Sequence, residues 1–393
     1  MSRHVVITAG VRTAIGTFGG ALSGHAPSEL GALVVGEALN RAGMPAAEVG
    51  HVVFGNVILT ESKDAYLARV AAIEAGIPVE VPAMTLNRLC GSGVQAIISA
   101  AQAIMLGDCD TAVAGGAETM SRAPHLLATA RFGQRMGDAV VADHLTGVLT
   151  DPFGNGIMGI TAENVAERYG IDREAQDAFA AESQRRAAEA IAAGRFKEQI
   201  LPVDVRKGRD TISFDTDEHP KPATTAETLK GLRPTFKKDG TVTPGNASGI
   251  NDGAAAMVLM EEGRASREGK PVLARLVGYA HAGVEPGVMG IGPVPAVQAL
   301  LKRTGLGLGD FDVIESNEAF AAQACAVAQE LGFDPARVNP NGGAIALGHP
   351  VGATGAIITL KAAYELQRSG GGYGLVTMCI GGGQGIALAI ERA

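Results

Sequence analysis

The amino-acid sequence predicts an α/β protein made of two similar halves. Short β-branched runs such as VVIT at 5–8, VVFG at 52–55 and TAVAGG at 111–116 alternate with longer helical stretches, which is typical of this class. The chain has 393 residues, of which 46% are hydrophobic, so it can form two or three domains with a substantial core.

The last third of the sequence repeats the pattern of the first. VGHVVFGN corresponds to FDVIESNEAF, which places Asn56 and Asn317 at matching points. CGSGVQAIISAAQAI is echoed by GHPVGATGAIITLKAA, and DTAVAGGAE is echoed by YGLVTMCIGGGQG. Any two α/β units share some resemblance, but three echoes in the same order favour a duplicated domain. Duplication would let two strand-to-helix turns face one site from opposite halves.

Between residues 121 and 247 the composition changes. Charged residues become dense, and two helices are expected, with Thr161 and Asp172 as N-caps and Gly170 and Gly194 as stops. We interpret this segment as an inserted, more solvated domain.

The sequence therefore divides into three parts. Residues 1–120 together with 248–271 form an N-terminal α/β half, residues 121–247 form the inserted loop domain, and residues 272–393 form a C-terminal α/β half. The α/β pattern resumes in the last part and continues to the end of the chain.

Charge and hydropathy argue against several classes of partner. The formal net charge is -8 and there is no long run of Lys or Arg, which argues against nucleic acid. The apolar run before Arg12 is too short for a signal peptide. Residues 89–107 and 370–390 carry no charge, but the first contains Ser and Gln and the second is rich in glycine. We expect both to be buried core rather than membrane helices.

Cys90, Cys109, Cys325 and Cys379 form no CxxC pair. This spacing argues against a zinc knuckle and against a disulfide framework. A reducing cytoplasm fits best, and the C-terminal ERA is not a peroxisomal signal.

Cys90 is the first candidate for a reactive group. It stands in NRLCGSG, at the expected start of a helix, where a helix N-terminus or a neighbouring imidazolium lowers a thiol pKa from about 8.5. The flanking glycines would leave backbone N–H groups free to bind an oxyanion. A buried structural cysteine is the alternative, and the local sequence does not decide between the two.

His349 and Cys379 stand in further glycine-rich turns. His349, in ALGHPVGATG, can serve as base to a thiol, although a histidine in a turn is more often an ordinary polar residue. Cys379, in TMCIGGGQG, closes an expected buried strand whose glycine turn offers N–H donors; strand packing is its alternative role.

Asn317 in SNEAF is a neutral amide after a strand, suited to holding a water or a carbonyl oxygen. Glu318 beside it is either a catalytic acid or a residue that orients the turn. The segment TVTPGNASGINDG at 241–253 is rich in small residues and could let a thin, extended ligand lie against the backbone.

Together these motifs resemble the thiolase family. Cys90 in NRLCGSG, Asn317 in NEAF, His349 in GHPVGATG and Cys379 in CIGGGQG occur in this order across nearly the whole chain, and GNASGINDGAAA adds a fifth match. Within the family the sequence is similar to bacterial β-ketothiolases of polyester and short-chain acyl metabolism. The resemblance implies a duplicated, five-layered αβαβα fold with an inserted loop domain that binds coenzyme A (CoA), and a cytoplasmic homotetramer that is a dimer of dimers.

The resemblance also implies the chemistry, a reversible Claisen condensation of an acyl-CoA with acetyl-CoA to 3-ketoacyl-CoA and CoA. Cys90 would take the acyl group as a thioester, with His349 lowering the thiol pKa. Cys379 would then remove a proton from the methyl of acetyl-CoA, while His349 and a water held by Asn317 stabilise the enolate. The N–H groups of Cys90 and Gly381 would bind the oxyanion. No metal and no resident cofactor is implied, since CoA enters as part of the substrate.

Further positions match family contacts to the substrate. Ser248 would lie against the pantetheine, Leu232 and Phe236 would line the adenine site, and Met158 and Phe320 would line the acyl or pantetheine region. Lys221 and Thr228 stand where relatives have an arginine and a serine near the nucleotide. Ile157 stands where short-chain relatives often have a histidine, so a degradative 3-ketoacyl-CoA thiolase with a longer-chain preference is the alternative.

Three rival functions remain to be weighed. A decarboxylating ketoacyl synthase of the same fold would use one cysteine and two histidines, and the pair His349 and Cys379 argues against it. A non-catalytic acyl-CoA or lipid-binding protein should have lost a catalytic residue, whereas all four are present. A subunit that works only within a multienzyme complex stays open.

Overall fold

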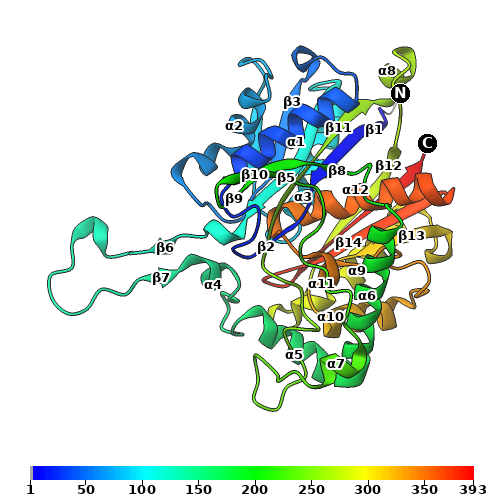
Figure 1. Ribbon diagram of the computed structural model, residues 1–393. Coiled ribbons are helices and arrows are strands. Elements are labelled where there is room, and N and C mark those ends of the chain that lie inside the picture. The colour runs from blue at the N-terminus through cyan, green and yellow to red at the C-terminus, as the bar shows by residue number, and fades with distance from the viewer. Residues whose placement is uncertain (1–2) are drawn as a thin grey trace.

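Eleven strands form one mixed sheet in the computed structural model, which describes residues 3–393 (Figure 1). These strands are β1 (Val5–Thr13), β2 (Gly16–Thr17), β3 (His51–Gly55), β4 (Ala83–Leu86), β5 (Thr111–Thr119), β8 (Ile200–Leu201), β11 (Asn251–Glu261), β12 (Ala274–Gly283), β13 (Phe311–Ser316), β14 (Tyr373–Ile380) and β15 (Gln384–Arg392). The predicted strands at 5–8, 52–55 and 111–116 are confirmed as β1, β3 and β5.

Apart from β4 at one edge, the strand order is symmetric about the contact between β1 and β12. It runs β13-β14-β15-β12-β1-β11-β5-β3-β4, with β2 paired to β11 and β8 to β1. In each half two parallel strands, β3 with β5 or β13 with β14, are followed by two antiparallel neighbours. The halves join through the pairs Val6–Arg275 and Ile7–Ala274. This repeated topology supports the duplication indicated by the sequence echoes.

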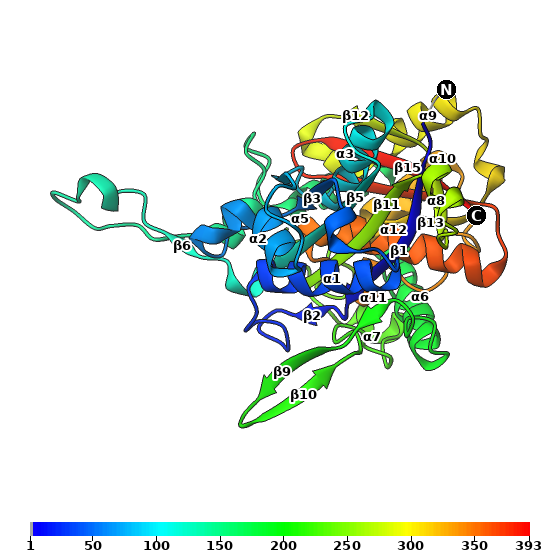
Figure 2. The same ribbon diagram turned by 90° about the horizontal axis from the view of Figure 1, so that it is seen from above.

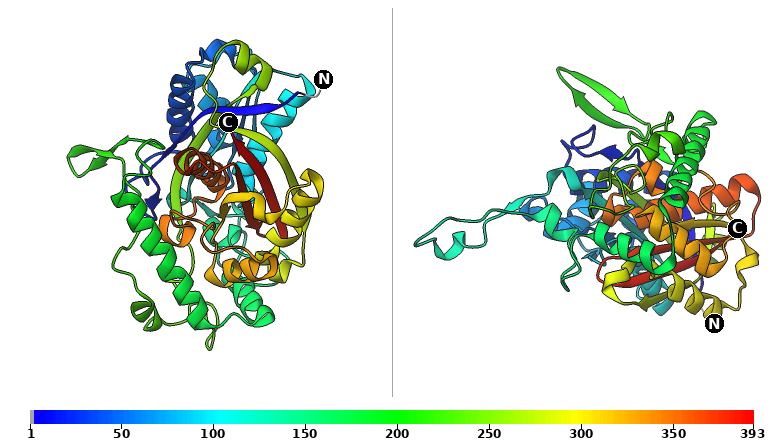
Figure 3. Two further views of the ribbon diagram at one scale, coloured as in Figure 1. Left: turned by 90° about the vertical axis from the view of Figure 1, so that its right-hand side faces the viewer. Right: turned by 90° about the horizontal axis from the view of Figure 1, so that it is seen from below.

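Helices form three layers around the two half-sheets (Figures 2 and 3). The helices concerned are α1 (Pro27–Arg41), α2 (Leu67–Glu74), α3 (Ser92–Leu106), α9 (Pro293–Thr304) and α12 (Val351–Ser369). Between the half-sheets, α3 packs on β3 and β5, while α12 packs on β5 and β11 and also on β13 and β14. Helices α1 and α2 cover the N-terminal half-sheet, and α9 packs on β12 and β15. The predicted five-layered αβαβα fold is therefore confirmed.

The two central helices touch through glycine. A Cβ on Gly93 would overlap the backbone nitrogen of Ala356, and a Cβ on Gly355 would overlap that of Val94. Close approach of two backbones requires residues without a side chain at the crossing. Because Gly93 and Gly355 lie near the N-terminal ends of α3 and α12, the residues that precede the two helices are brought together.

One helix of the described chain, spanning Leu89–Leu106, is long and apolar enough by length and composition to cross a membrane. In this structure it contains α3, which packs between β5 and α12, and more than half of the stretch is buried.

Between β5 and β11, which are antiparallel neighbours, the chain runs outside the sheet except at the short strand β8. The intervening elements are β6 (His125–Leu126), β7 (Ala142–Asp143), α4 (His144–Val148), α5 (Met158–Tyr169), α6 (Arg173–Ala192), β9 (Val203–Lys207), β10 (Asp210–Phe214) and α7 (Ala226–Lys230). The arm that carries β6 and β7 and the hairpin of β9 and β10 project from the body (Figures 1 and 2). A buried ion pair between Arg12 Nη1 and Asp217 Oδ1, 2.7 Å long, ties this segment to β1.

The two helices predicted in this segment are present as α5 and α6. Asp172 caps α6 by accepting the Ala175 N–H at 2.8 Å, and Gly170, with φ +66°, ends α5. Helix α6 ends at Ala192, shortly before Gly194. The expectation that Thr161 is an N-cap is wrong, because extended backbone at Ile157 starts α5 one turn earlier and the Thr161 hydroxyl donates to the Met158 carbonyl.

The remaining helices include α10 (Ala321–Leu331), which packs against α5, α6 and α9, and several short elements. The short elements are α8 (Glu262–Arg267), α11 (Ala344–Leu347) and the 3₁₀ turns η1 (Ala46–Glu48), η2 (Ser62–Tyr66), η3 (Met120–Arg122), η4 (Ala130–Phe132), η5 (Pro286–Ile291) and η6 (Leu308–Asp310).

Candidate active site

A mainly apolar cavity of about 230 Å³ lies where the N-terminal ends of α3 and α12 meet the inserted segment. Residues from both halves and from the inserted segment line it. The predicted site residues on its wall are Cys90, Met158, Phe236, Ser248, Phe320, His349 and Gly381.

Cys90 occupies a strained turn directly before α3. The preceding residue, Leu89, has φ +46°, a left-handed conformation that costs a non-glycine residue about 1 to 3 kcal/mol and is often found at functional sites. Ser92 holds the turn, because its hydroxyl accepts the Arg88 N–H at 2.8 Å and donates to the Leu89 carbonyl at 2.7 Å. The prediction that Cys90 stands at the start of a helix is confirmed.

The Cys90 thiol is held by backbone N–H groups in an apolar surrounding. Burial raises its pKa above the ordinary value, and a nearby carboxylate, Glu118, acts in the same direction. The N–H groups of Gly381 and of Cys90 itself donate to the sulfur and lower the pKa, but burial is the larger effect. Around neutral pH the group is therefore a thiol, and the two donors match the pair assigned to the oxyanion.

The hydrogen bonds of His349 define which ring nitrogen carries the proton. Its Nδ1 lies 2.7 Å from Oγ1 of Thr354, whose hydroxyl proton is given to the Pro350 carbonyl at 2.8 Å. Thr354 must therefore accept from Nδ1–H, which leaves the lone pair on Nε2. Nε2 is buried and has no hydrogen-bond partner among residues 3–393, while the His349 ring forms part of the cavity wall.

Burial lowers the pKa of His349 to about 4, so the imidazole is neutral near pH 7. The expectation that His349 lowers the pKa of Cys90 is not supported, because the shifts of the two groups favour a neutral thiol beside a neutral imidazole. The physical reason is that burial in an apolar site penalises both charged forms. Proton transfer between the two must then accompany the attack of sulfur on a substrate.

Cys379 lies behind the cavity wall, near the end of β14. It is fully buried and packs with Met289 and Ala319, both of which line the cavity. Burial and the neighbouring Cys90 raise the pKa of Cys379 far above its usual range, so the thiolate of Cys379 would be a strong base.

Asn317 follows β13, as Asn56 follows β3. Its N–H donates to the Thr377 carbonyl at 3.0 Å, while both polar atoms of its amide are buried without a hydrogen-bond partner in the described chain. A buried amide in this state can bind a ligand or a water.

Glu318 orients the turn instead of facing the cavity. Its carboxylate accepts the Ser183 hydroxyl at 2.6 Å, the Asn339 amide at 2.7 Å and the Ile345 N–H at 3.2 Å. These contacts favour the second of the two roles considered for Glu318, in which it holds the loop that carries Asn317.

Aromatic rings from the inserted segment and the C-terminal half meet at the cavity. Phe236 and Phe320 pack edge to face, with ring centroids 6.2 Å apart and an interplanar angle of 84°. The Ser248 N–H donates to the Ala319 carbonyl at 3.0 Å, which places the loop beside these rings. A Cβ on Gly159 would overlap the Phe236 ring, so α5 can approach it only through glycine.

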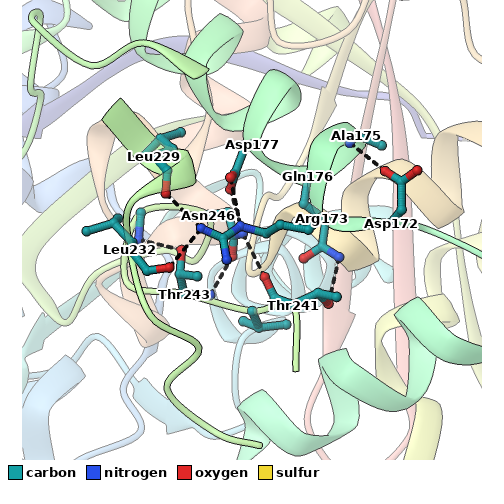
Figure 4. A network of polar contacts seen from close by, with 12 residues as sticks. Asp172, Arg173, Ala175, Gln176, Asp177, Leu229, Leu232, Thr241, Thr243 and Asn246 are labelled. Atoms are coloured by element: carbon teal, nitrogen blue, oxygen red, sulfur yellow. Dashed lines mark hydrogen bonds and ion pairs between the residues drawn. The ribbon is translucent and has the colours of Figure 1, made fainter. Parts of the chain in front are cut away.

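A polar network holds the loop that leads to Ser248 (Figure 4). Arg173 donates to Asp177 at 2.7 Å and to the carbonyls of Leu229 and Leu232 at 2.7 and 3.0 Å. The Asn246 amide donates to the other oxygen of Asp177 at 2.9 Å. The network therefore joins α6 to both ends of the segment 229–246.

Three predicted CoA contacts lie outside the cavity. The side chains of Lys221, Thr228 and Leu232 are exposed on the inserted segment. The Thr228 hydroxyl donates to the Thr225 carbonyl at 2.8 Å and accepts the Thr225 N–H, so it already caps α7. Assignment of these three residues to CoA stays a prediction.

The sequence analysis missed two residues that hold His349. Thr354 lies within GHPVGATG, one helical turn and a half after the histidine, so its spacing could have suggested the contact. Asn251, whose side-chain oxygen accepts the His349 N–H at 2.9 Å, is far away in the sequence and gives no local signal.

Family models and known proteins match this chain along nearly its whole length. The family model for the thiolase N-terminal domain matches residues 5–263, and that for the thiolase C-terminal domain matches residues 270–392. The chain is 62% identical to "Beta-ketothiolase BktB" of Cupriavidus necator over 100% of both chains. It is 53% identical to "Acetyl-CoA acetyltransferase" of Pseudomonas aeruginosa over 99% of this chain and 100% of the relative.

Two solved structures have nearly the same fold. The acetyl-CoA acetyltransferase of Bacillus anthracis matches with a TM-score of 0.98 at 48% identity, over 100% of this chain and 99% of the other. The human mitochondrial 3-ketoacyl-CoA thiolase in complex with CoA matches with a TM-score of 0.96 at 44% identity, over 100% of this chain and 98% of the other.

Proposed function

The chain belongs to the thiolase family, and on this premise we propose that it is an acetyl-CoA acetyltransferase. It catalyses the reversible Claisen condensation of an acyl-CoA with acetyl-CoA to 3-ketoacyl-CoA and CoA. One observation carries the assignment of roles: the unpartnered Nε2 of His349 and the thiol of Cys90 face the same cavity, with the Gly381 N–H at the sulfur.

In the first half-reaction Cys90 acquires the acyl group. His349 Nε2 takes the thiol proton as the sulfur attacks the thioester carbonyl, and the N–H groups of Cys90 and Gly381 bind the resulting oxyanion. When the tetrahedral intermediate collapses, the bond to CoA breaks and CoA leaves as a thiolate. The Cys379 thiol protonates it, so that CoA departs as a neutral thiol and Cys379 becomes a thiolate.

In the second half-reaction Cys379 acts as base. Its thiolate removes a proton from the methyl of acetyl-CoA, and the carbanion forms a carbon–carbon bond to the acyl group on Cys90. Cys90 leaves as a thiolate and recovers its proton from His349. A water held by Asn317, together with His349, stabilises the enolate oxygen, a role that fits the buried and unpartnered Asn317 amide.

The comparisons favour an acetyltransferase over the degradative, longer-chain alternative. The relatives named as a β-ketothiolase or an acetyl-CoA acetyltransferase share 62% and 53% of their residues with this chain, against 44% for the human 3-ketoacyl-CoA thiolase. The 3-ketoacyl-CoA product would serve polyester or fatty acid metabolism. Acyl-CoA and acetyl-CoA are the partners in the reaction, and the side chains above supply nucleophile and base, so we propose no metal and no resident cofactor.

The test is intact-mass analysis after mixing with acetyl-CoA. Wild type and Cys379→Ala should gain roughly 42 Da, the mass of an acetyl group, since the covalent intermediate accumulates when the second step fails. Cys90→Ser should gain no thioester-linked mass. A wild-type protein that binds CoA without forming an adduct would instead indicate an acyl-CoA binding protein.

We further propose a cytoplasmic homotetramer, a dimer of dimers. The arm that carries β6 and β7 projects from the body and exposes large apolar side chains, with Phe132 at 92% and Met136 at 88% exposure. Exposed apolar clusters of this kind mark interaction sites. Light scattering should show a tetramer for wild type and a dimer for the Phe132→Ser, Met136→Ser double variant; an unchanged mass would contradict this role of the arm. Four free cysteines fit a reducing compartment.

A further inference from the structure

A buried carboxylate that the proposed mechanism does not use lies near Cys90 and contacts the first turn of the helix that follows His349. Glu118, at the end of β5, is fully buried. Its Oε2 accepts the N–H groups of Val57 at 3.0 Å and Gly352 at 2.9 Å. Its Oε1 accepts the Ile58 N–H at 3.0 Å and the Asn56 amide at 3.1 Å. Both oxygens are therefore occupied by donors from two separate parts of the chain.

One of these donors belongs to the helix that follows His349. Gly352 is the second residue of α12, and Thr354, which orients the His349 ring, lies in the same turn. A Cβ on Gly352 would come within 2.6 Å of Glu118 Oε2, so the carboxylate and the helix are in direct contact. A negative charge at a helix N-terminus is favourable because it faces unpaired N–H groups and the positive end of the helix dipole.

The other donors belong to the wall beside Cys90. Val57 and Ile58 pack in one apolar cluster with Val351, and Cys90 packs against this cluster. The backbone of both residues is held by Glu118. A single carboxylate from the N-terminal half thus connects the surroundings of the thiol with the first turn of α12, the helix that directly follows His349.

We infer that Glu118 is a positioning residue for the acyl-transfer step, and that it keeps Cys90 and His349 at the separation required for proton transfer. The inference rests on the proposed function. A loss of about 1 Å in alignment is enough to slow an intramolecular step by about a hundredfold.

The contacts favour the ionised form of this carboxyl. All four contacting atoms are N–H donors, so a carboxyl proton would find no acceptor among them and would displace one contact. Burial acts in the opposite direction and raises the pKa of Glu118 to about 8. Against an ionised Glu118, glutamine puts an amide NH₂ donor opposite an N–H group and breaks one contact, so acetylation should slow. Glutamine would instead mimic a protonated Glu118 and leave the rate unchanged.

The experiment compares Glu118→Gln with a matched variant, Glu163→Gln. Glu163 is also buried and accepts backbone N–H groups, those of Thr241 and Val242 at 2.9 Å, but it holds a loop of the inserted segment. The readout is the rate of Cys90 acetylation by acetyl-CoA in rapid-quench mass spectrometry, as a function of acetyl-CoA concentration. The melting temperature of each variant is measured in parallel.

Glu118→Gln should lower the maximal acetylation rate at least about tenfold, with the half-saturating acetyl-CoA concentration nearly unchanged, since alignment and not binding is lost. The acetylation rate of Glu163→Gln should stay within about twofold of the wild-type rate, even if its melting temperature falls as far as that of Glu118→Gln. Glu118→Asp, which keeps the charge on a shorter side chain, should lie in between.

A wild-type rate in Glu118→Gln, or an equal loss in Glu163→Gln, would overturn the inference. If wild type itself forms no acetyl-enzyme, the proposed function fails instead, so the two failures are distinguishable. Asn56→Ala, which removes one of the four donors, serves as a milder variant if Glu118→Gln does not fold, and it should slow acetylation without unfolding the protein; an undiminished rate would also count against the inference.

Discussion

Nδ1 of His349 lies 2.7 Å from Oγ1 of Thr354, a hydroxyl whose own proton is given to the carbonyl of Pro350. The threonine can therefore only accept from the ring, and the ring must present the lone pair of Nε2 to the cavity. The reactive tautomer is thus selected by a side chain of the helix that follows the histidine.

Replacing Thr354 should impair acyl transfer without changing substrate binding. Thr354→Val keeps the size of the side chain but removes the acceptor, so the Nδ1–H form is no longer favoured and the acetylation rate of Cys90 should fall about 10- to 100-fold. Thr354→Ser keeps the hydroxyl and should retain most of the rate. Equal rates in wild type and Thr354→Val would show that the tautomer is fixed in another way.

The low pKa of His349 should appear as a loss of stability in acid. The pKa of this residue is about 4 in the folded protein against 6.5 for a free histidine, so between these values the unfolded chain binds a proton that the folded chain does not. The stabilising contribution is complete above pH 6.5 and is lost as the pH falls toward 4.

Denaturant unfolding of wild type and His349→Asn tests whether this contribution to stability is lost as the pH falls. Between about pH 7 and 4.5, wild type should lose roughly 2 to 3 kcal/mol more unfolding free energy than the variant, which has no imidazole to titrate. Parallel losses in both proteins would mean that His349 is not neutral in the folded state.

Alkylation of Cys90 by iodoacetamide should report a neutral thiol. Because burial raises the pKa of Cys90, the rate should keep rising with pH through about pH 9, as the thiolate fraction grows. A thiolate–imidazolium pair would give a rate that already levels off below about pH 7. Cys90→Ser identifies the modified residue by mass.

Two glycine-to-alanine changes in helices should have opposite effects on stability. A methyl on Gly93 would overlap the backbone of α12, so Gly93→Ala should destabilise the protein by several kcal/mol, on the order of other overpacked cores or more. A methyl on Gly36, in α1, would meet no atom of residues 3–393 within 4 Å, so Gly36→Ala should stabilise the protein by about 0.5 to 1 kcal/mol. A Gly93→Ala protein as stable as wild type in denaturant unfolding would contradict the packing described for α3 and α12, and Gly36→Ala serves as the control for the intrinsic effect of the substitution in a helix.

Most of the fold was predictable because each half carries its own periodic pattern. The β-branched runs became β1, β3 and β5, and the paired echoes became two sets of strands with the same topology. Helix ends were predicted where a specific side chain or a left-handed glycine determines them, as at Asp172 and Gly170. The prediction that Thr161 is an N-cap was wrong because extended backbone at Ile157 starts the helix one turn earlier.

The site was predictable as a set of residues but not in its electrostatics. The local sequence places Cys90 at a helix N-terminus and predicts a lowered pKa, whereas burial, which depends on packing from the rest of the chain, raises it. The sequence also left open whether Glu318 acts on substrate, and only its partners from three segments show that it orients the turn. The contact between Glu118 and Gly352 joins residues from opposite halves and has no local signal.

The central position of α12 affects the order in which the protein can form during synthesis. Nearly the whole helix is buried, and it packs on strands of both halves although it lies close to the C-terminus. While the ribosome is still adding residues, one apolar face of α3 and of the N-terminal sheet has no partner. The nascent chain must therefore present this surface to solvent or to chaperones until α12 has left the ribosome. The reactive cysteine is made early, but it meets its base only after the residues around α12, more than 250 positions later, have been translated.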